Sequence, residues 1–276
     1  MYVVGELNSD APIGVFDSGV GGISVLKHIH AILPHEDLLY CADSRYAPYG
    51  NKSPQFICER AIYLADFLIE RNAKALVVAC NTATAAAVST LRNNYQIPII
   101  GMEPAVKPAV AITKTGVIGV LATSGTLKSA QFAALLEHYG HHVTVVTQAC
   151  YGLVEAIEHG ELDAESTTQL LKQYLEPLLL AGADTIVLGC THYPFVSASI
   201  QKMVGESVAL IDTGLAVAKQ LQKRLNDTGL LKSPKTLPNS DGQVSFWTNS
   251  DLADAEIVLS RLWGHPISSK QFSNIL

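Results

Sequence analysis

The sequence lacks the features that would point to a polymer or a membrane as partner. Its 276 residues carry a formal net charge of -6, and no run of lysine or arginine occurs. A protein that binds nucleic acid needs a basic surface, so this charge balance argues against that partner. No apolar stretch reaches the roughly 18 residues of a membrane helix, and residues 1–10 do not resemble a signal peptide. We therefore expect a protein of the cytoplasm with no membrane partner.

Cysteine is scarce, and its spacing indicates no metal site. The five cysteines, at positions 41, 58, 80, 150 and 190, form no CxxC pair. Neither a zinc knuckle, a thioredoxin-type site nor a full disulfide framework fits an odd number with this spacing. Reduced thiols are the simpler interpretation, and a lone cysteine is most often a small buried apolar side chain. We expect no metal.

The phosphate-binding signatures of nucleotide enzymes are also missing. The glycine-rich turn at residues 17–22 follows an apolar run, but it has neither the GxGxxG spacing nor the GK[ST] ending. A nucleotide is therefore only a minor alternative at this turn. No lysine of the kind that binds pyridoxal phosphate (PLP) is evident at a strand end. We expect an enzyme without a cofactor.

Short β-branched runs alternate with longer helical patterns along most of the chain. This rhythm is typical of βαβ units, which build parallel sheets. Helices are predicted at 23–33, 54–71, 215–226 and 251–263. The predicted strands are 12–16, 38–40, 75–79, 97–101, 116–121, 143–147, 185–189, 208–211 and 244–247.

An internal repeat divides this pattern into two halves. The segment AKALVVAC, residues 73–80, aligns with ADTIVLGC, residues 183–190, at an offset of 110. IGVFDS, residues 13–18, aligns with IGVLAT, residues 118–123, at an offset of 105. Two matches in the same order at nearly equal offsets indicate a duplicated unit, although βαβ strands resemble one another.

The repeat predicts an α/β fold with two pseudo-symmetric, doubly wound parallel-sheet lobes and the active site in the cleft between them. The first lobe is expected to be discontinuous, 1–105 plus 213–276, and to carry Cys80. The second is expected at 106–212 and carries Cys190. The strand and helix after the loop 229–242 are too little for a domain, so we expect them to return to the first lobe.

Cys80 and Cys190 occupy equivalent strand ends, where the ligands of open parallel sheets gather. Each cysteine precedes a predicted helix N-terminus, which favours the thiolate and should lower the thiol pKa toward neutrality. Two such thiols on facing lobes can remove a proton from one side of a carbon and return it from the other. We therefore predict stereoinversion, with buried packing or a reversible disulfide as alternatives.

Three further features could hold a substrate near the thiols. Asp17 could bind an ammonium group or orient a base, although it could equally cap a helix. The turn 46–50 could grip a carboxylate, or it could be a plain connecting loop. His192, two residues after Cys190, could stabilise a thiolate or serve as an auxiliary acid or base.

Four motifs together resemble the glutamate racemases. They are DSGVGGISVL (17–26), ADSRYAPYG (42–50), ACNTATA (79–85) and GCTHYPF (189–195), and the resemblance spans roughly residues 12–226. It implies interconversion of L- and D-glutamate without a cofactor, supplying the D-isomer for peptidoglycan. By resemblance, Cys80 acts on D-glutamate and Cys190 on L-glutamate.

The resemblance also implies roles for the residues around the thiols. An acid near Cys150 assists in the family; Glu158 is the better match, and Glu155 stays open. Thr123 is the counterpart of Ser18 in the repeat and joins the binding residues. The substrate-binding set is therefore Asp17, Ser18, Tyr49, Gly50, Asn81, Thr82, Thr123, Thr191 and His192, and the catalytic set is Cys80, Cys190, Asp17, His192 and Glu158.

Two other functions compete with this one. A racemase acting on aspartate or another acidic substrate could use the same paired thiols, although the contexts CNT and CTHYP favour glutamate. A two-lobed binding protein would explain the cleft and the repeat, but not two equivalent cysteines. The partner is in either case a small molecule, and a homodimer is one option for the assembly.

Overall fold

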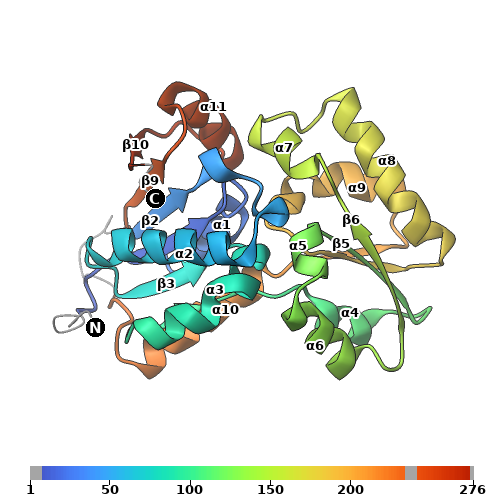
Figure 1. Ribbon diagram of the computed structural model, residues 1–276, viewed down its shortest axis with the longest axis horizontal. Helices are drawn as coiled ribbons and strands as arrows, with labels where there is room; N and C mark the ends of the chain where they lie inside the picture. The colour runs from blue at the N-terminus through green and yellow to red at the C-terminus, as the bar shows by residue number, and fades with distance from the viewer. Residues whose placement is uncertain (1–7, 234–240, 274–276) are drawn as a thin grey trace.

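Two parallel β-sheets, one in each lobe, organise the protein (Figure 1). The computed structural model describes residues 8–233 and 241–273. The six-stranded first sheet has the order β10-β9-β2-β1-β3-β4, and the four-stranded second sheet has the order β6-β5-β7-β8. The strands are β1 (Ile13–Asp17), β2 (Leu38–Ala42), β3 (Ala75–Val78), β4 (Ile99–Ile100), β5 (Val117–Ala122), β6 (Thr144–Ala149), β7 (Thr185–Leu188), β8 (Ala209–Ile211), β9 (Val244–Thr248) and β10 (Ser269–Gln271).

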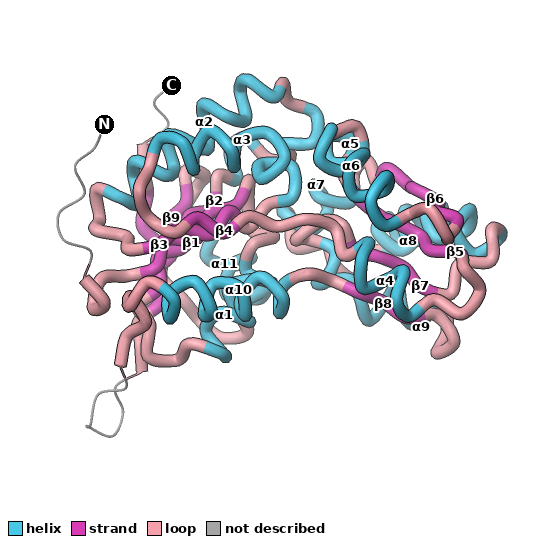
Figure 2. The backbone as a smooth tube through the Cα atoms, turned by 90° about the horizontal axis from the view of Figure 1, so that it is seen from below, coloured by secondary structure: helices cyan, strands magenta, loops and turns pink. Residues whose placement is uncertain are grey.

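Helices cover both faces of each sheet, so the fold is doubly wound. In Figure 2, α2 and α3 lie on one side of the first sheet, and α1 and α10 lie on the other. The second sheet packs against α7, α8 and α9 on one face and against α4 and α6 on the other. The helices are α1 (Ile23–Ile32), α2 (Pro54–Ile69), α3 (Asn81–Asn94), α4 (Val106–Ile112), α5 (Ser124–Leu127), α6 (Ala130–Tyr139), α7 (Leu153–Glu158), α8 (Glu165–Leu180), α9 (Ser197–Val204), α10 (Gly214–Asp227) and α11 (Leu252–Trp263), with short 3-10 turns η1 (Ser44–Tyr46), η2 (Tyr49–Asn51) and η3 (Tyr193–Val196).

The register of the strands confirms the internal repeat. The order β2-β1-β3-β4 in the first sheet matches β6-β5-β7-β8 in the second. Ile13 of β1 pairs with Ala75 of β3, and Ile118 of β5 pairs with Thr185 of β7. These pairs carry the offsets of 105 and 110 found in the sequence, so Cys80 and Cys190 follow structurally equivalent strands.

A pair of glycines lets each sheet approach its helix closely. A Cβ added to Gly14 would lie 3.0 Å from Leu68 Cδ1 of α2, and one added to Gly119 would lie 2.8 Å from Leu178 Cδ1 of α8. Both the glycines and the leucines are counterparts in the repeat. The small residue is therefore required at the same point of each lobe, because packed interiors leave no room for an extra methyl group.

The C-terminal segment extends the first sheet. β9 pairs with β2, and β10, which the sequence did not predict, pairs with β9. The boundary expected at 105/106 falls at the start of α4 and that at 212/213 between β8 and α10; both boundaries stay predictions. No helix or strand is predicted in residues 1–10 or in the loop 229–242. Residues 1–7 and 234–240 of these segments lie outside the described residues. None of the helices described is long and apolar enough to cross a bilayer.

Candidate active site

Both predicted catalytic thiols line one pocket between the carboxyl ends of the two sheets. Its free volume is about 10 Å³, which is room for about one water molecule. A substrate of several heavy atoms can enter only if the two lobes move apart or side chains shift. The lining residues are Ser18, Pro48, Tyr49, Gly50, Cys80, Asn81, Thr82, Thr123, Thr126, Val154, Gly189, Cys190, Thr191 and His192.

Cys80 caps the N-terminus of α3 with its sulfur. The Ala83 N–H donates to Cys80 Sγ at 3.4 Å, and the Cys80 thiol lies 3.7 Å from Ser18 Oγ. Burial, together with the negative charge of Asp17, raises the Cys80 pKa well above its usual value, although the Ala83 amide opposes the shift. The expectation of a Cys80 pKa near neutrality is wrong, because one helix N-terminus does not offset desolvation.

Asp17 lies fully buried at the end of β1, just beneath the pocket. Its Oδ1 accepts from the Ser18 N–H at 2.6 Å, and its Oδ2 accepts from the Gly22 N–H at 2.5 Å and from Thr191 Oγ1 at 3.2 Å. Burial raises the Asp17 pKa, although His192 opposes the shift. Asp17 thus binds the residue before α1 and a hydroxyl of the second lobe. It does not cap the helix, because α1 has no side-chain cap hydrogen bond.

Cys190 begins a chain of three polar groups. Its Sγ lies 3.6 Å from His192 Nδ1, and His192 Nε2 lies 2.6 Å from Glu158 Oε1. Burial acts to lower the His192 pKa, but the bonds to Cys190 and Glu158 raise it well above the usual value. His192 is therefore held between the Cys190 sulfur and the Glu158 carboxylate. The geometry selects Glu158 over Glu155 as the partner of His192.

The turn at Tyr49 and Gly50 is held from beneath by a buried ion pair. Asp43 accepts hydrogen bonds from the Tyr49 hydroxyl, from Arg60 Nη2 at 2.6 Å and from Asn249 Nδ2 at 2.7 Å. On the pocket side, the Gly50 carbonyl accepts a bond from Ser124 Oγ at 3.0 Å. Hydrogen bonds from other elements therefore hold the turn in place, and its carboxylate-binding role stays a prediction.

Asn81 and three threonines supply the remaining polar lining. Neither the Asn81 amide nitrogen nor its oxygen has a partner within the described part of the chain, although both are buried. Buried polar atoms of this kind normally bind something, so Asn81 is equipped to bind a polar ligand. The Thr82, Thr123 and Thr126 hydroxyls lie 2.8 to 3.2 Å apart and join the two lobes.

The predicted site residues thus converge, and the sequence missed the residues behind them. Asp43 and Ser44 lie inside the motif 42–50, but only Tyr49 and Gly50 of that motif were predicted to bind substrate. Arg60 lies on α2 and Asn249 follows β9, and neither has a local pattern that would reveal its role. Within residues 8–233 and 241–273, no cluster of three or more His, Cys, Asp or Glu side chains could hold a metal ion.

The fold and the site together define a class: a two-lobed α/β protein with paired thiols in its interlobe pocket. The family model for Asp/Glu/Hydantoin racemase matches residues 13–221. A glutamate racemase of Ectopseudomonas mendocina is 54% identical over 257 residues, which are 93% of this chain and 96% of that protein.

Solved structures agree with this family. A glutamate racemase isoform from Bacillus anthracis superposes with a TM-score of 0.87 at 35% identity, over 97% of this chain and 99% of that one. The Francisella tularensis glutamate racemase, solved in complex with D-glutamate, gives a TM-score of 0.82 at 31% identity, over 96% and 98%. The chain belongs to the Asp/Glu/Hydantoin racemase family, among its glutamate racemases, and is an isomerase.

Proposed function

We propose that the protein interconverts L- and D-glutamate by transferring protons at Cα between two thiols, without a cofactor. The observation that carries the proposal is that Cys80 and Cys190 follow equivalent strands and line the same pocket. The similarity to enzymes named glutamate racemases supports the choice of substrate.

The two sulfurs have different surroundings. Cys80 is buried near Asp17 and favours the neutral thiol, which can donate a proton. The Cys190 sulfur lies 3.6 Å from His192 Nδ1, and the raised pKa of His192 favours the imidazolium beside it. This pair fits attack of Cys190 on the Cα proton of L-glutamate and delivery of a proton by Cys80 to the other side. The roles reverse for D-glutamate.

The polar lining supplies groups for the other ends of the substrate. Asn81, the threonine hydroxyls and the turn at Tyr49 and Gly50 offer donors for carboxylates. Asp17 offers a negative charge beneath the pocket; Ser18, Thr191 and His192 complete the proposed binding set. Closure around the substrate would exclude water and hold the carbon between the sulfurs, which is the main requirement of an inversion with little other chemistry.

The test is an assay of the purified protein with no PLP added, in which a coupled enzyme detects D-glutamate formed from L-glutamate. L-Aspartate serves as the competing substrate. We expect racemisation of glutamate well above that of aspartate, and loss of it in both Cys80→Ala and Cys190→Ala proteins that keep their circular dichroism spectra. Faster turnover of aspartate would reassign the substrate, and a Cys190→Ala protein with wild-type activity would refute the thiol pair.

We also propose that the D-glutamate supplies peptidoglycan synthesis in the cytoplasm. Five free cysteines are compatible with a reducing compartment. Depletion of the protein in cells should then produce a requirement for external D-glutamate and loss of cell shape; growth and shape unaffected by depletion would contradict this role. A homodimer stays a prediction that sedimentation can check.

A further inference from the structure

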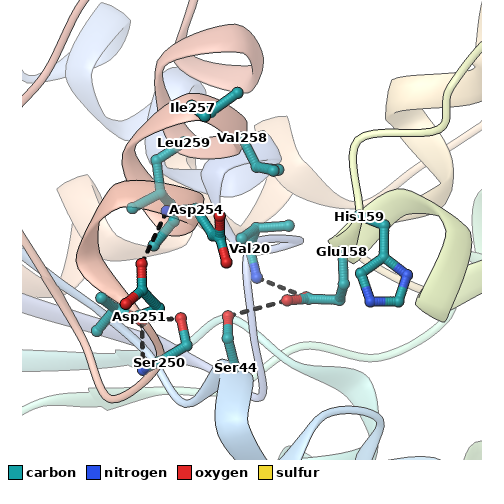
Figure 3. Close-up of a pocket in the computed structure, with 12 residues that line it drawn as sticks. Val20, Ser44, Glu158, His159, Ser250, Asp251, Asp254, Ile257, Val258 and Leu259 are labelled. Atoms are coloured by element: carbon teal, nitrogen blue, oxygen red, sulfur yellow. Dashed lines mark hydrogen bonds between the residues drawn. The ribbon is translucent and has the colours of Figure 1, made fainter.

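The Glu158 carboxylate is bound by both lobes at once. Glu158 belongs to α7 of the second lobe, and its Oε1 lies 2.6 Å from His192 Nε2 of the same lobe. From the first lobe, the Val20 N–H donates to Oε1 at 2.7 Å and Ser44 Oγ donates to Oε2 at 2.9 Å. Figure 3 shows the carboxylate reaching from α7 toward Val20 and Ser44. One side chain therefore connects the Cys190 partner to the opposite lobe.

The glycine-rich turn of the first lobe is shaped to receive this pair of side chains. A Cβ on Gly19 would lie 1.9 Å from Glu158 Oε1, and a Cβ on Gly21 would lie 2.3 Å from His192 Nδ1. Real Cβ atoms do not approach other atoms so closely, so a side chain at either position would displace Glu158 or His192 from its place. The glycine-rich turn 17–22, which has no nucleotide-binding signature, thus makes room for Glu158 and His192.

We propose that Ser44 is a positioning residue: with the Val20 amide and the glycine turn it forms a latch that engages Glu158 on closure and so fixes His192 against Cys190. The inference rests on the proposed function. It adds Ser44, and the link from Ser44 through Glu158 to His192, which the thiol mechanism itself does not require. Ser44 does not line the pocket that holds the two thiols, so it acts through Glu158.

Ser44 can affect His192 because a buried carboxylate must be hydrogen-bonded to keep its position. The Glu158 side chain is only 11% exposed and the His192 side chain 1% exposed, so the carboxylate keeps its place only while donors replace water around it. Two of its donors come from the first lobe and are lost when the lobes separate. The other ring nitrogen of His192 contacts the Cys190 sulfur, so a displaced Glu158 leaves the imidazole without the second partner that orients it.

The experiment compares two serines of one surface pocket. Ser44 and Ser250 both line the pocket drawn in Figure 3, but only Ser44 contacts Glu158. We expect Ser44→Ala to lower kcat for glutamate about tenfold with KM little changed, because a hydrogen bond to a charged group is lost. Ser44→Thr, which keeps the hydroxyl, should stay within about threefold of wild type, and Ser250→Ala within about twofold.

A double-mutant cycle separates the latch from a general disturbance of the turn. In a Glu158→Ala background, the further change Ser44→Ala should alter kcat by less than about twofold, since the shared interaction is already gone. Gly19→Ala tests the same contact from the other side and should also lower kcat, with an unchanged circular dichroism spectrum.

Two results would overturn the latch: equal kcat in the Ser44→Ala and Ser250→Ala proteins, or a full Ser44→Ala effect that persists without Glu158. A raised KM at unchanged kcat in the Ser44→Ala protein would also count against it, because that pattern indicates a loosened Tyr49–Gly50 turn. If the wild-type protein does not racemise glutamate, the proposed function itself fails, and that outcome is distinct from these three.

Discussion

The buried ion pair beneath the pocket gives the sharpest prediction about stability. The Asp43 and Arg60 side chains are both 0% exposed. Arg60 binds Asp43 through Nη2 at 2.6 Å and Nε at 3.0 Å, and its guanidinium lies 4.5 Å from the Tyr46 ring and 4.7 Å from the Tyr63 ring. The change Arg60→Met removes the cation and both bonds but preserves much of the volume.

The expected loss follows from what remains buried. Asp43 would keep its bonds from Tyr49 and Asn249 but would have no compensating charge, and breaking a buried pair in this way costs about 3–5 kcal/mol. For a chain of this size, that loss corresponds to a fall in Tm of roughly 10 °C. KM for glutamate should rise too, because Asp43 supports the Tyr49–Gly50 turn.

The assay is thermal and urea unfolding followed by circular dichroism, with Lys223→Ala as the control. The Lys223–Asp227 pair is largely exposed, at 69% and 44%, and an exposed pair contributes about 0–1 kcal/mol. If Arg60→Met destabilised the protein no more than Lys223→Ala does, the ion pair would not hold the turn in place.

Three other predictions concern packing, pH and thiol chemistry. Gly14→Ala should reduce the unfolding free energy by about 1–3 kcal/mol through overpacking, and an unchanged urea midpoint would contradict this. Because the His192 pKa is raised from 6.5 in the folded protein, its stabilisation should be complete below pH 6.5 and fall away as the pH rises through the folded value. The test is the difference in unfolding free energy between wild type and His192→Gln, measured from below pH 6.5 upward. A difference that does not change with pH would refute the prediction. Iodoacetamide at pH 8 should alkylate the partly exposed Cys58 before the buried Cys41 and Cys80, whose pKa values are raised by burial; peptide mass spectra that showed Cys80 labelled first would count against its neutral state.

The sequence predicted the lobes and the thiol pair because both depend on local patterns that occur twice. The runs before Cys80 and Cys190 repeat at offset 110, and strand pairing preserves that offset. Whether a segment forms a helix or a strand was likewise predictable from the spacing of its apolar residues. β10 was missed because Ser269–Gln271 has a polar pattern and is a strand only through its pairing with β9.

The groups behind the pocket were not predictable in the same way. Arg60 reaches Asp43 across 17 residues and Asn249 across 206, and the partners of Glu158, Ser44 and Val20, are more than 100 residues away in the chain. Such contacts exist only after folding. The direction of the Cys80 pKa shift cannot be predicted from the sequence for a related reason: the helix N-terminus that follows the cysteine is visible in the sequence, whereas the extent of burial around the sulfur is not.

The most direct test of the two-thiol account is the fate of the Cα hydrogen. L-Glutamate, and D-glutamate in a parallel reaction, is incubated with the protein in deuterated water, and the product is analysed by mass spectrometry in the first few per cent of conversion. Delivery of a solvent-derived proton from the opposite face predicts deuterium at Cα of essentially every product molecule in both directions. Product that retained the substrate hydrogen would contradict proton removal by one sulfur and return by the other.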